Sequence, residues 1–322
     1  MRFWKSTALI AAVIFSNSLI SSQAQAHKSP NEITINIVGD VHGERAIKRD
    51  ALSSLKKYFA DGNLNIFNLE TAVTDKNQRE EKQYNFKTQP DFLASLKSIG
   101  FNVATIANNH TYDYGNEGFL DTIRNLDKSG IAYVGGGLNS DIAYKGRVFT
   151  VKGIRIGILG FAKVNSGPAS IAAKNRPGTT NGYDVAATTH AIDAMKKVSD
   201  VIIILAHWGE EGSFCPRAAE EVSAKQWISH GADIIVGSHT HTLQPITYAE
   251  NKLVAYSMGN FIFYSSAIEN RRTAILKIKI SPTKRISYRM QPFEIDNATK
   301  VPIPSISPQP IICSTPAVST GA

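Results

Sequence analysis

Five short polar clusters could carry metal-dependent chemistry, and each follows directly on a strand-like run. They occupy residues 39–43, 68–70, 107–110, 206–209 and 237–241. Five of the eight histidines lie in them, together with Asp40, Glu70 and Asn109. Imidazole, carboxylate and amide oxygen are ligands suited to Mn, Zn or Fe. Because loops at strand ends collect ligand-binding side chains, we expect a centre for two divalent transition-metal ions with one bridging carboxylate.

The paired histidines in the last cluster need a particular backbone path. His239 and His241 alternate across an extended segment, so a local bend is required for both to face the ions. Gly237 is expected to supply the freedom for that bend, since glycine tolerates unusual backbone angles.

The elements that must position the clusters alternate between strand and helix patterns. We expect strands over residues 33–39, 65–69, 102–107, 200–206 and 233–236, and helices over 46–59, from 90, over 116–129, 185–197 and 218–229. A hairpin is expected over 147–161, a long loop over 163–183, and strands without helices over 253–257, 272–280 and 286–294. A βαβ start with a β-rich end predicts an α/β fold with sheets packed together and helices outside.

The two ends of the chain differ from this central domain. Residues 1–26 hold Arg2 and Lys5, then an apolar run and a Ser-rich stretch that ends in Ala26, which is the order of a secretory signal peptide. We expect cleavage after Ala26 and a periplasmic or secreted protein, with an uncleaved anchor as the alternative. The domain is expected over residues 27–298, followed by a proline-rich C-terminal tail over 299–322.

Charge and cysteine content limit the possible partners. The chain carries a formal charge of +8, of which +6 remains after residues 1–26 are removed. A positive surplus suits an anionic substrate or polymer, although it is also common in periplasmic proteins. Nothing beyond this surplus indicates nucleic-acid binding. Cys215 and Cys313 either pair in an oxidising compartment or remain free thiols.

Read together, the motifs resemble a known family. The order Asp-x-His, acidic residue, Asn-His, His, His-x-His is similar to the calcineurin-like metallophosphoesterases. A closer resemblance is to the CapA family of capsule-synthesis proteins that handle poly-γ-glutamate, through residues 68–70, 107–115, 207–211, 231–233, 241–245 and 256–261. The matches run from about residue 33 to 280. This resemblance implies two packed mixed β-sheets flanked by helices.

The resemblance also implies roles for single residues. Asp40, His42, Glu70 and His241 would hold one metal ion, and Glu70, Asn109, His207 and His239 the other, with Glu70 as the bridge. His110 is implied as the general acid or transition-state donor. Asp113, Trp208 and Asn260 are candidates to support these groups or contact substrate, with core packing as the alternative for Trp208.

Some positions depart from the patterns that these families share. Glu70 stands where classical phosphoesterases have Asp, and His42 stands where CapA proteins commonly have no ligand. Ser238 and Thr240 replace the usual His and Pro around the paired histidines.

Three functions fit these features. The first is a two-metal hydrolase that cleaves an amide or phosphoester bond in an anionic polymer such as poly-γ-glutamate. The second is a non-catalytic accessory subunit that binds the polymer in a membrane synthase or export complex. The third is a general periplasmic phosphodiesterase or nucleotidase, which would need an aromatic clamp for the base.

Overall fold

The structure is a computed structural model that describes residues 31–43, 47–306 and 313. The expected signal peptide and its cleavage site after Ala26 lie outside these residues, as does most of the expected tail. No helix within the described ranges is long and apolar enough to cross a bilayer.

One mixed sheet contains the N-terminal and C-terminal strands of the domain. Its order is β18-β17-β16-β1-β2-β5-β6, with β15 also pairing with β1. The parallel part is β1 (Ile33–Val41), β2 (Leu64–Leu69), β5 (Val103–Thr105) and β6 (Ala132–Val134), with β15 (Asn260–Ile262) parallel to β1. The antiparallel part is β16 (Arg272–Ile280), β17 (Ile286–Ile295) and β18 (Pro302–Pro304).

A second mixed sheet is built from the middle of the chain. Its order is β13 (Ile246–Ala249), β14 (Lys252–Ala255), β12 (Ile234–Ser238), β11 (Val201–His207), β9 (Ile154–Ala162) and β8 (Arg147–Val151). The four central strands are parallel and the two edge strands are antiparallel. Two small ribbons pair β3 (Ala72–Val73) with β4 (Lys87–Thr88), and β7 (Gly136–Gly137) with β10 (Gly178–Thr179).

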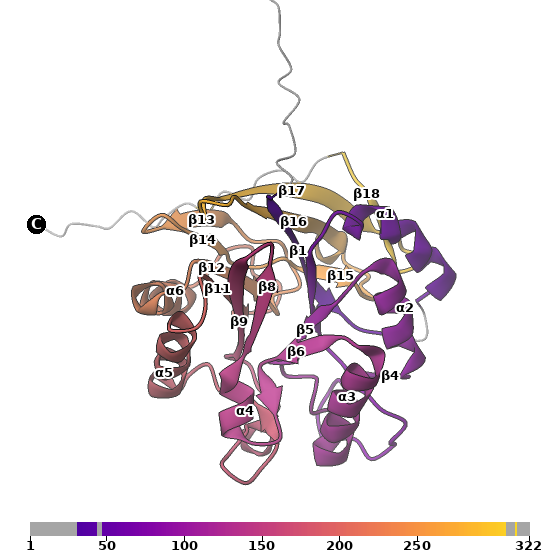
Figure 1. Cartoon of the computed structure of the whole chain (residues 1–322). Helices are drawn as coiled ribbons and strands as arrows, with labels where there is room; N and C mark the ends of the chain where they lie inside the picture. The colour runs from indigo at the N-terminus through magenta and orange to yellow at the C-terminus, as the bar shows by residue number, and fades with distance from the viewer. Residues whose placement is uncertain (1–30, 44–46, 307–312, 314–322) are drawn as a thin grey trace, which may run out of the picture. The chain divides into compact units, whose positions relative to one another are not determined.

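Helices cover the outer faces of the sheets (Figure 1). The 3-10 helix η1 (Arg49–Leu55) and helices α1 (Lys56–Phe59), α2 (Asp91–Ile99) and α3 (Gly115–Ser129) lie beside the first sheet. Helices α5 (Val185–Lys196) and α6 (Ala218–His230) pack on the second, and the short α4 (Ser140–Lys145) precedes β8. The 3-10 turns η2 (Pro168–Ser170) and η3 (Glu269–Arg271) complete the described elements.

The apolar residues form three layers of core. Between the sheets, branched side chains such as Ile37, Ile203 and Val236 belong to one buried cluster. The other two clusters fill the spaces between each sheet and its helices. Continuous β-branched runs suit strands that are buried on both faces, and their burial is the main favourable contribution to folding. The predicted α/β fold, with two packed mixed sheets flanked by helices, is confirmed.

Several local expectations change. The helix expected over 46–59 is mostly a 3-10 segment, η1, followed by a single α turn. The long loop over 163–183 contains η2 and the short strand β10, which pairs with glycines 136 and 137. Within the expected tail, Pro302–Pro304 forms β18 at the edge of the first sheet. An edge strand tolerates proline because one of its two hydrogen-bonding edges has no partner strand.

The two cysteines are paired in the structure. Cys215 and Cys313 form a disulfide with Cα atoms 5.8 Å apart. The alternative of two free thiols is therefore not what the structure shows, and Cys313 is joined to the loop that follows β11.

Trp208 packs in the layer between the second sheet and α6, and its substitution tests that packing. Its side chain is fully buried, stacks on Trp227 at 5.3 Å, and its Nε1 donates to the Tyr256 carbonyl at 2.8 Å. We expect Trp208→Ala to lower the free energy of unfolding by about 3–5 kcal/mol. Urea unfolding followed by far-ultraviolet circular dichroism measures this. A midpoint equal to that of the unaltered protein would contradict the core assignment.

Candidate metal centre

The five polar clusters converge at one edge, where the parallel strands of both sheets end. Two groups of side chains have donor atoms within 4.8 Å of one another: Glu70, His207 and His239, and Asp40, Glu70 and His241. Glu70 belongs to both groups, which is the arrangement expected of a bridging carboxylate.

Glu70 is the central feature of this edge. Its side chain is fully buried, and neither carboxylate oxygen has a hydrogen-bond partner among the described residues. Burial and then the neighbouring Asp40 carboxylate raise the pKa of Glu70 well above its ordinary value. An unpaired buried carboxylate is costly unless cations compensate it. The residues therefore fit divalent metal ions on either side of Glu70.

His207 reaches the centre from the end of β11. Its Nε2 lies 2.7 Å from Asn109 Oδ1 and 3.8 Å from Glu70 Oε1. Its Nδ1 lies 2.9 Å from Ser238 Oγ and 3.2 Å from Asn68 Nδ2. Burial lowers the pKa of His207 well below its ordinary value, and a neutral imidazole is the form that binds metal. If Nδ1–H donates to Ser238, the Nε2 lone pair is left for an ion.

His239 and His241 make the bend between them with their own backbones. Their φ angles are +92° and +58°, values that non-glycine residues adopt rarely and mostly under functional constraint. The expectation that Gly237 supplies the bend is wrong, because Gly237 continues β12. Burial lowers the pKa of His239 to about 4, and its Nδ1 is buried without a partner among the described residues.

Gly237 and Gly39 instead allow a close approach of backbones. A Cβ on Gly237 would lie 1.8 Å from the carbonyl oxygen of Tyr256, and one on Gly39 would lie 1.8 Å from that of Gly259. The segment 256–260 also hydrogen-bonds to both strand ends, through Met258 N to Gly237 O at 3.0 Å and Asp40 N to Gly259 O at 2.9 Å. Both strand ends are thus in direct backbone contact with this segment.

Asp40 and His241 form the other part of the centre. Asp40 accepts hydrogen bonds from Asn68 Nδ2 at 2.8 Å and from the His239 amide at 3.2 Å, and its Oδ2 lies 3.5 Å from His241 Nδ1. Burial opposes ionisation of Asp40, but these partners together lower its pKa. His241 Nδ1 lies 2.8 Å from Asn260 Oδ1, so Asn260 orients this ring.

One ring nitrogen of His110 faces the centre, and the other contacts a carboxylate. Its Nε2 lies 3.9 Å from Glu70 Oε1, and its Nδ1 lies 2.8 Å from Asp113 Oδ2. Burial lowers the pKa of His110, and the Asp113 contact opposes that shift. Lys82 forms an ion pair with Asp113 and donates to the Asn109 carbonyl at 2.7 Å. This set of contacts fixes both the ring of His110 and the loop that carries it.

Two predicted site residues are not members of the ligand groups. His42 belongs to neither group. Its ring stacks on Phe86 with centroids 4.8 Å apart, and burial lowers its pKa to about 3. Trp208 faces the core, as described above, so the alternative of core packing holds for it.

The sequence reasoning assigned no role to five residues that shape the centre. They are Asn68, Lys82, Phe86, Asn108 and Ser238. Asn68, Asn108 and Ser238 lie inside the polar clusters, so their position was a usable signal. Asn108 Nδ2 donates to Asn68 Oδ1 at 2.9 Å, and Asn108 Oδ1 accepts from the His110 amide at 2.9 Å. Lys82 and Phe86 lie in a polar loop with no pattern that marks them.

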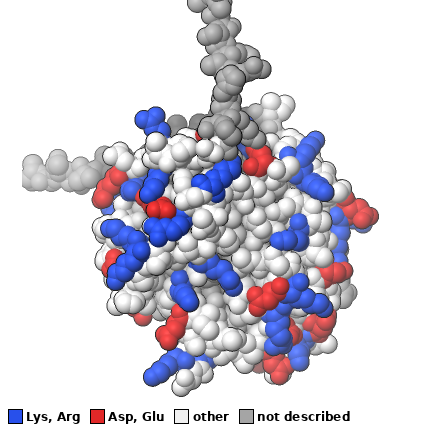
Figure 2. Space-filling model, in the orientation of Figure 1, with Lys and Arg blue, Asp and Glu red and all other residues white. Residues whose placement is uncertain are grey.

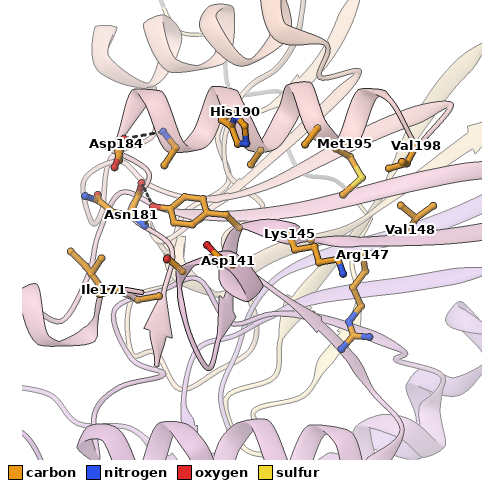
Figure 3. A pocket seen from close by; sticks show the side chains of 18 residues that line it. Asp141, Lys145, Arg147, Val148, Ile171, Asn181, Asp184, His190, Met195 and Val198 are labelled. Atoms are coloured by element: carbon orange, nitrogen blue, oxygen red, sulfur yellow. Dashed lines mark hydrogen bonds between the residues drawn. The ribbon is translucent and has the colours of Figure 1, made fainter. Parts of the chain in front are cut away.

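A wide groove lies elsewhere on the molecule, between α4, β8 and α5 (Figure 3). It has a volume of about 1070 Å³ and contains none of the candidate ligands. Its lining is mostly apolar, with residues such as Ala191 and Met195. The charged side chains that line it have both signs, among them Lys145, Arg147 and Asp141. This lining gives no preference for an anionic ligand.

Comparison with known proteins places the chain in a family. The sequence model of the family described as "Bacterial capsule synthesis protein PGA_cap" matches residues 34–265. The chain belongs to this family. The matched range contains all five polar clusters and the loop that carries Lys82 and Phe86, so the whole candidate centre lies within the part of the chain that defines the PGA_cap family.

Relatives of the chain carry capsule-related names. It is 30% identical over 286 residues to "PGA biosynthesis protein CapA" of Bacillus subtilis (strain 168), covering 85% of this chain and 75% of that protein. It is 29% identical over 298 residues to "Capsule biosynthesis protein CapA" of Bacillus anthracis, covering 87% and 71%. Among solved structures, a 5'-nucleotidase from Candida albicans SC5314 aligns with a TM-score of 0.49 and 14% identity, covering 83% of this chain and 52% of that one.

The unpaired Glu70 carboxylate leads to a prediction about stability. In the metal-free protein the raised pKa means that the folded state holds a proton which the unfolded state has lost, so stability falls as pH rises above the ordinary glutamate pKa. We expect Glu70→Gln to raise the melting temperature in chelator at neutral pH. With saturating Mn²⁺ the order should reverse, because only the unaltered protein gains stability from bound ions.

Differential scanning fluorimetry in chelator and in Mn²⁺ checks this reversal. Glu250→Gln is the matched control, since Glu250 is an exposed carboxylate in the turn between β13 and β14, away from the centre. A Glu70→Gln protein that is less stable than the control in chelator, with no response to metal in either, would show that Glu70 is an ordinary structural carboxylate.

Proposed function

We propose that the chain is an exported two-metal hydrolase that cleaves an anionic polymer of the poly-γ-glutamate type during capsule metabolism. Glu70 carries this proposal. Its buried carboxylate has no hydrogen-bond partner among the described residues, and carboxylate and imidazole donor atoms from three other strand ends lie around it. His110 supports it further, since a histidine backed by a carboxylate faces the same point. A merely structural cluster does not need a proton-transfer group aimed at it.

The ligand residues would be Asp40, Glu70 and His241 for one ion, and Glu70, Asn109, His207 and His239 for the other. Two divalent ions there would polarise the scissile group and lower the pKa of the attacking water. Asp113 holds His110 in the tautomer with Nδ1–H, which leaves Nε2 to exchange a proton with substrate. Burial lowers the pKa of His110 and so favours its neutral form. The negative charge of a bound substrate would act in the opposite direction and favour the protonated form, which donates to the leaving group.

Family membership and charge support the proposed substrate class. Relatives are named for synthesis of poly-γ-glutamate capsule or of capsule generally. The positive surplus suits an anionic chain, and Figure 2 shows Lys and Arg side chains spread over one face with fewer acidic groups between them. Such a distribution favours weak, long-range attraction of a polymer over a single charged docking patch. Amide and phosphoester bonds are both within the chemistry of this donor set.

An accessory, non-catalytic role is the second candidate. A "Probable polyglutamine synthesis accessory protein" of Mycobacterium tuberculosis (strain ATCC 25618 / H37Rv) is 30% identical over 207 residues, covering 61% of this chain and 54% of that protein. In this role the chain would bind the polymer or synthase subunits without cleaving a bond. A nucleotidase is less well supported, because Phe86, the aromatic ring beside His110, already has an imidazole on each face.

Substitution of His110 separates catalysis from binding. We expect His110→Ala to lower kcat by about 10²–10⁴ while the metal content stays unchanged, since His110 is not a ligand. His207→Ala is expected to lose bound metal as well. The substrates are poly-γ-glutamate, with chain length followed by gel filtration, and bis(p-nitrophenyl) phosphate. If the unaltered protein binds two ions but His110→Ala matches its rate on either substrate, the accessory role is favoured.

The disulfide supports the export part of the proposal, because such bonds persist mainly in oxidising compartments. We expect protein recovered from the cell envelope to begin at residue 27 and to contain no free thiol, by intact mass after alkylation without reductant. Cys313→Ser is the control, which should expose one alkylated thiol at Cys215. A protein that keeps residues 1–26 with both thiols free would contradict export.

A further inference from the structure

His42 has the position of a ligand without the contacts of one. It follows β1 two residues after Asp40, and its amide donates to the Ile262 carbonyl at 3.0 Å. Its side chain is 3% exposed. No other described residue hydrogen-bonds to either ring nitrogen, and His42 is absent from both groups of converging donors. Among the described residues, the contacts that hold the ring are therefore packing contacts.

That packing is a stack of three rings. The His42 and Phe86 rings are nearly parallel, with centroids 4.8 Å apart and planes 9° apart. The other face of Phe86 lies on His110, at 4.0 Å and 23°. Phe263 closes the side of the stack, with its ring centroid 4.1 Å from that of His42 and the two planes 89° apart. Stacked and edge-on pairs at such separations contribute about 0.5–1.5 kcal/mol each beyond burial of their area.

Phe86 is also fixed to the partner of His110 by its backbone. The Phe86 amide donates to Asp113 Oδ2 at 2.6 Å, the same oxygen that lies 2.8 Å from His110 Nδ1. The loop between β3 and β4 thus contacts His110 through the Phe86 ring and supports it through Asp113. Loss of the His42 ring would leave one face of Phe86 without a neighbour and loosen this arrangement.

We propose that His42 binds no metal ion and instead supports His110, as the outer ring of the stack His42–Phe86–His110. His42 is thus a positioning residue that acts through Phe86. The inference rests on the proposed function, in which His110 transfers the proton. An ion between Asp40 and His241 would then have three side-chain ligands including Glu70, and it would be held more weakly than one at His207.

A matched pair of substitutions separates the two roles of the His42 ring. His42→Phe keeps an aromatic ring and removes the nitrogen donors, whereas His42→Asn keeps a donor and removes the ring. We expect His42→Phe to bind as many Mn²⁺ ions per chain as the unaltered protein, by elemental analysis after equilibrium dialysis. His241→Ala is the control that should lose one ion. If His42→Phe loses an ion as His241→Ala does, the proposal is overturned.

The stack is tested separately in the metal-free protein. With histidines labelled at ¹³Cε1, the Phe86 ring current should shift the His110 resonance, and Phe86→Leu should remove that shift. We expect His42→Asn to move the His110 resonance and His42→Phe to restore most of it, with melting temperatures confirming folding. An unchanged His110 resonance in His42→Asn would overturn the positioning role.

The metal-binding and resonance experiments distinguish failure of the proposed function from failure of the proposed role of His42. If the unaltered protein binds no metal and His207→Ala changes nothing, the two-metal function fails, while the resonance experiment still decides whether the stack exists. If metal binds and His207→Ala loses it, the dialysis experiment decides the role of His42 alone.

Discussion

Burial of the Glu70 carboxylate at the meeting edge of two sheets determines much of this structure. A buried carboxyl group without a hydrogen-bond partner among the described residues is unfavourable, and it becomes far more so when it is ionised. It persists here because the surrounding backbone is specified by the apolar layers on either side, which do not depend on Glu70. The folding energy of the sheets thus maintains a site with an unmet demand for positive charge.

The donors around Glu70 come from both sheets. Asp40 and Asn109 belong to strand ends of the first sheet, and His207, His239 and His241 to those of the second. Asn68 joins the two sets, because one amide group contacts both Asp40 and His207. Bound ions would therefore link the sheets directly, and the geometry of the centre depends on how the sheets pack.

The sequence predicted the fold class and the convergence of the five clusters, because each cluster follows a buried strand and the carboxyl ends of parallel strands meet. It could not predict the place of Lys82 or Phe86, since their loop has no periodic pattern and is positioned by long-range contacts with His110 and Asp113. The bend at His239 and His241 was assigned to the wrong residue, because glycine at 237 serves close approach and not flexibility. The disulfide needed a distance that no sequence provides.

The segment 256–260 has an evolutionary consequence. It crosses from the second sheet to the first and lies against Gly39 and Gly237, where one added carbon atom would overlap its carbonyl oxygens. A substitution at either glycine would push a ligand-bearing strand away from the other sheet, and no single change on the opposite side could compensate. Replacement of a ligand such as Glu70 by another carboxylate changes one donor group, whereas a side chain at either glycine displaces backbone. Two residues without a side chain thus limit how the ligand-bearing strands can be changed.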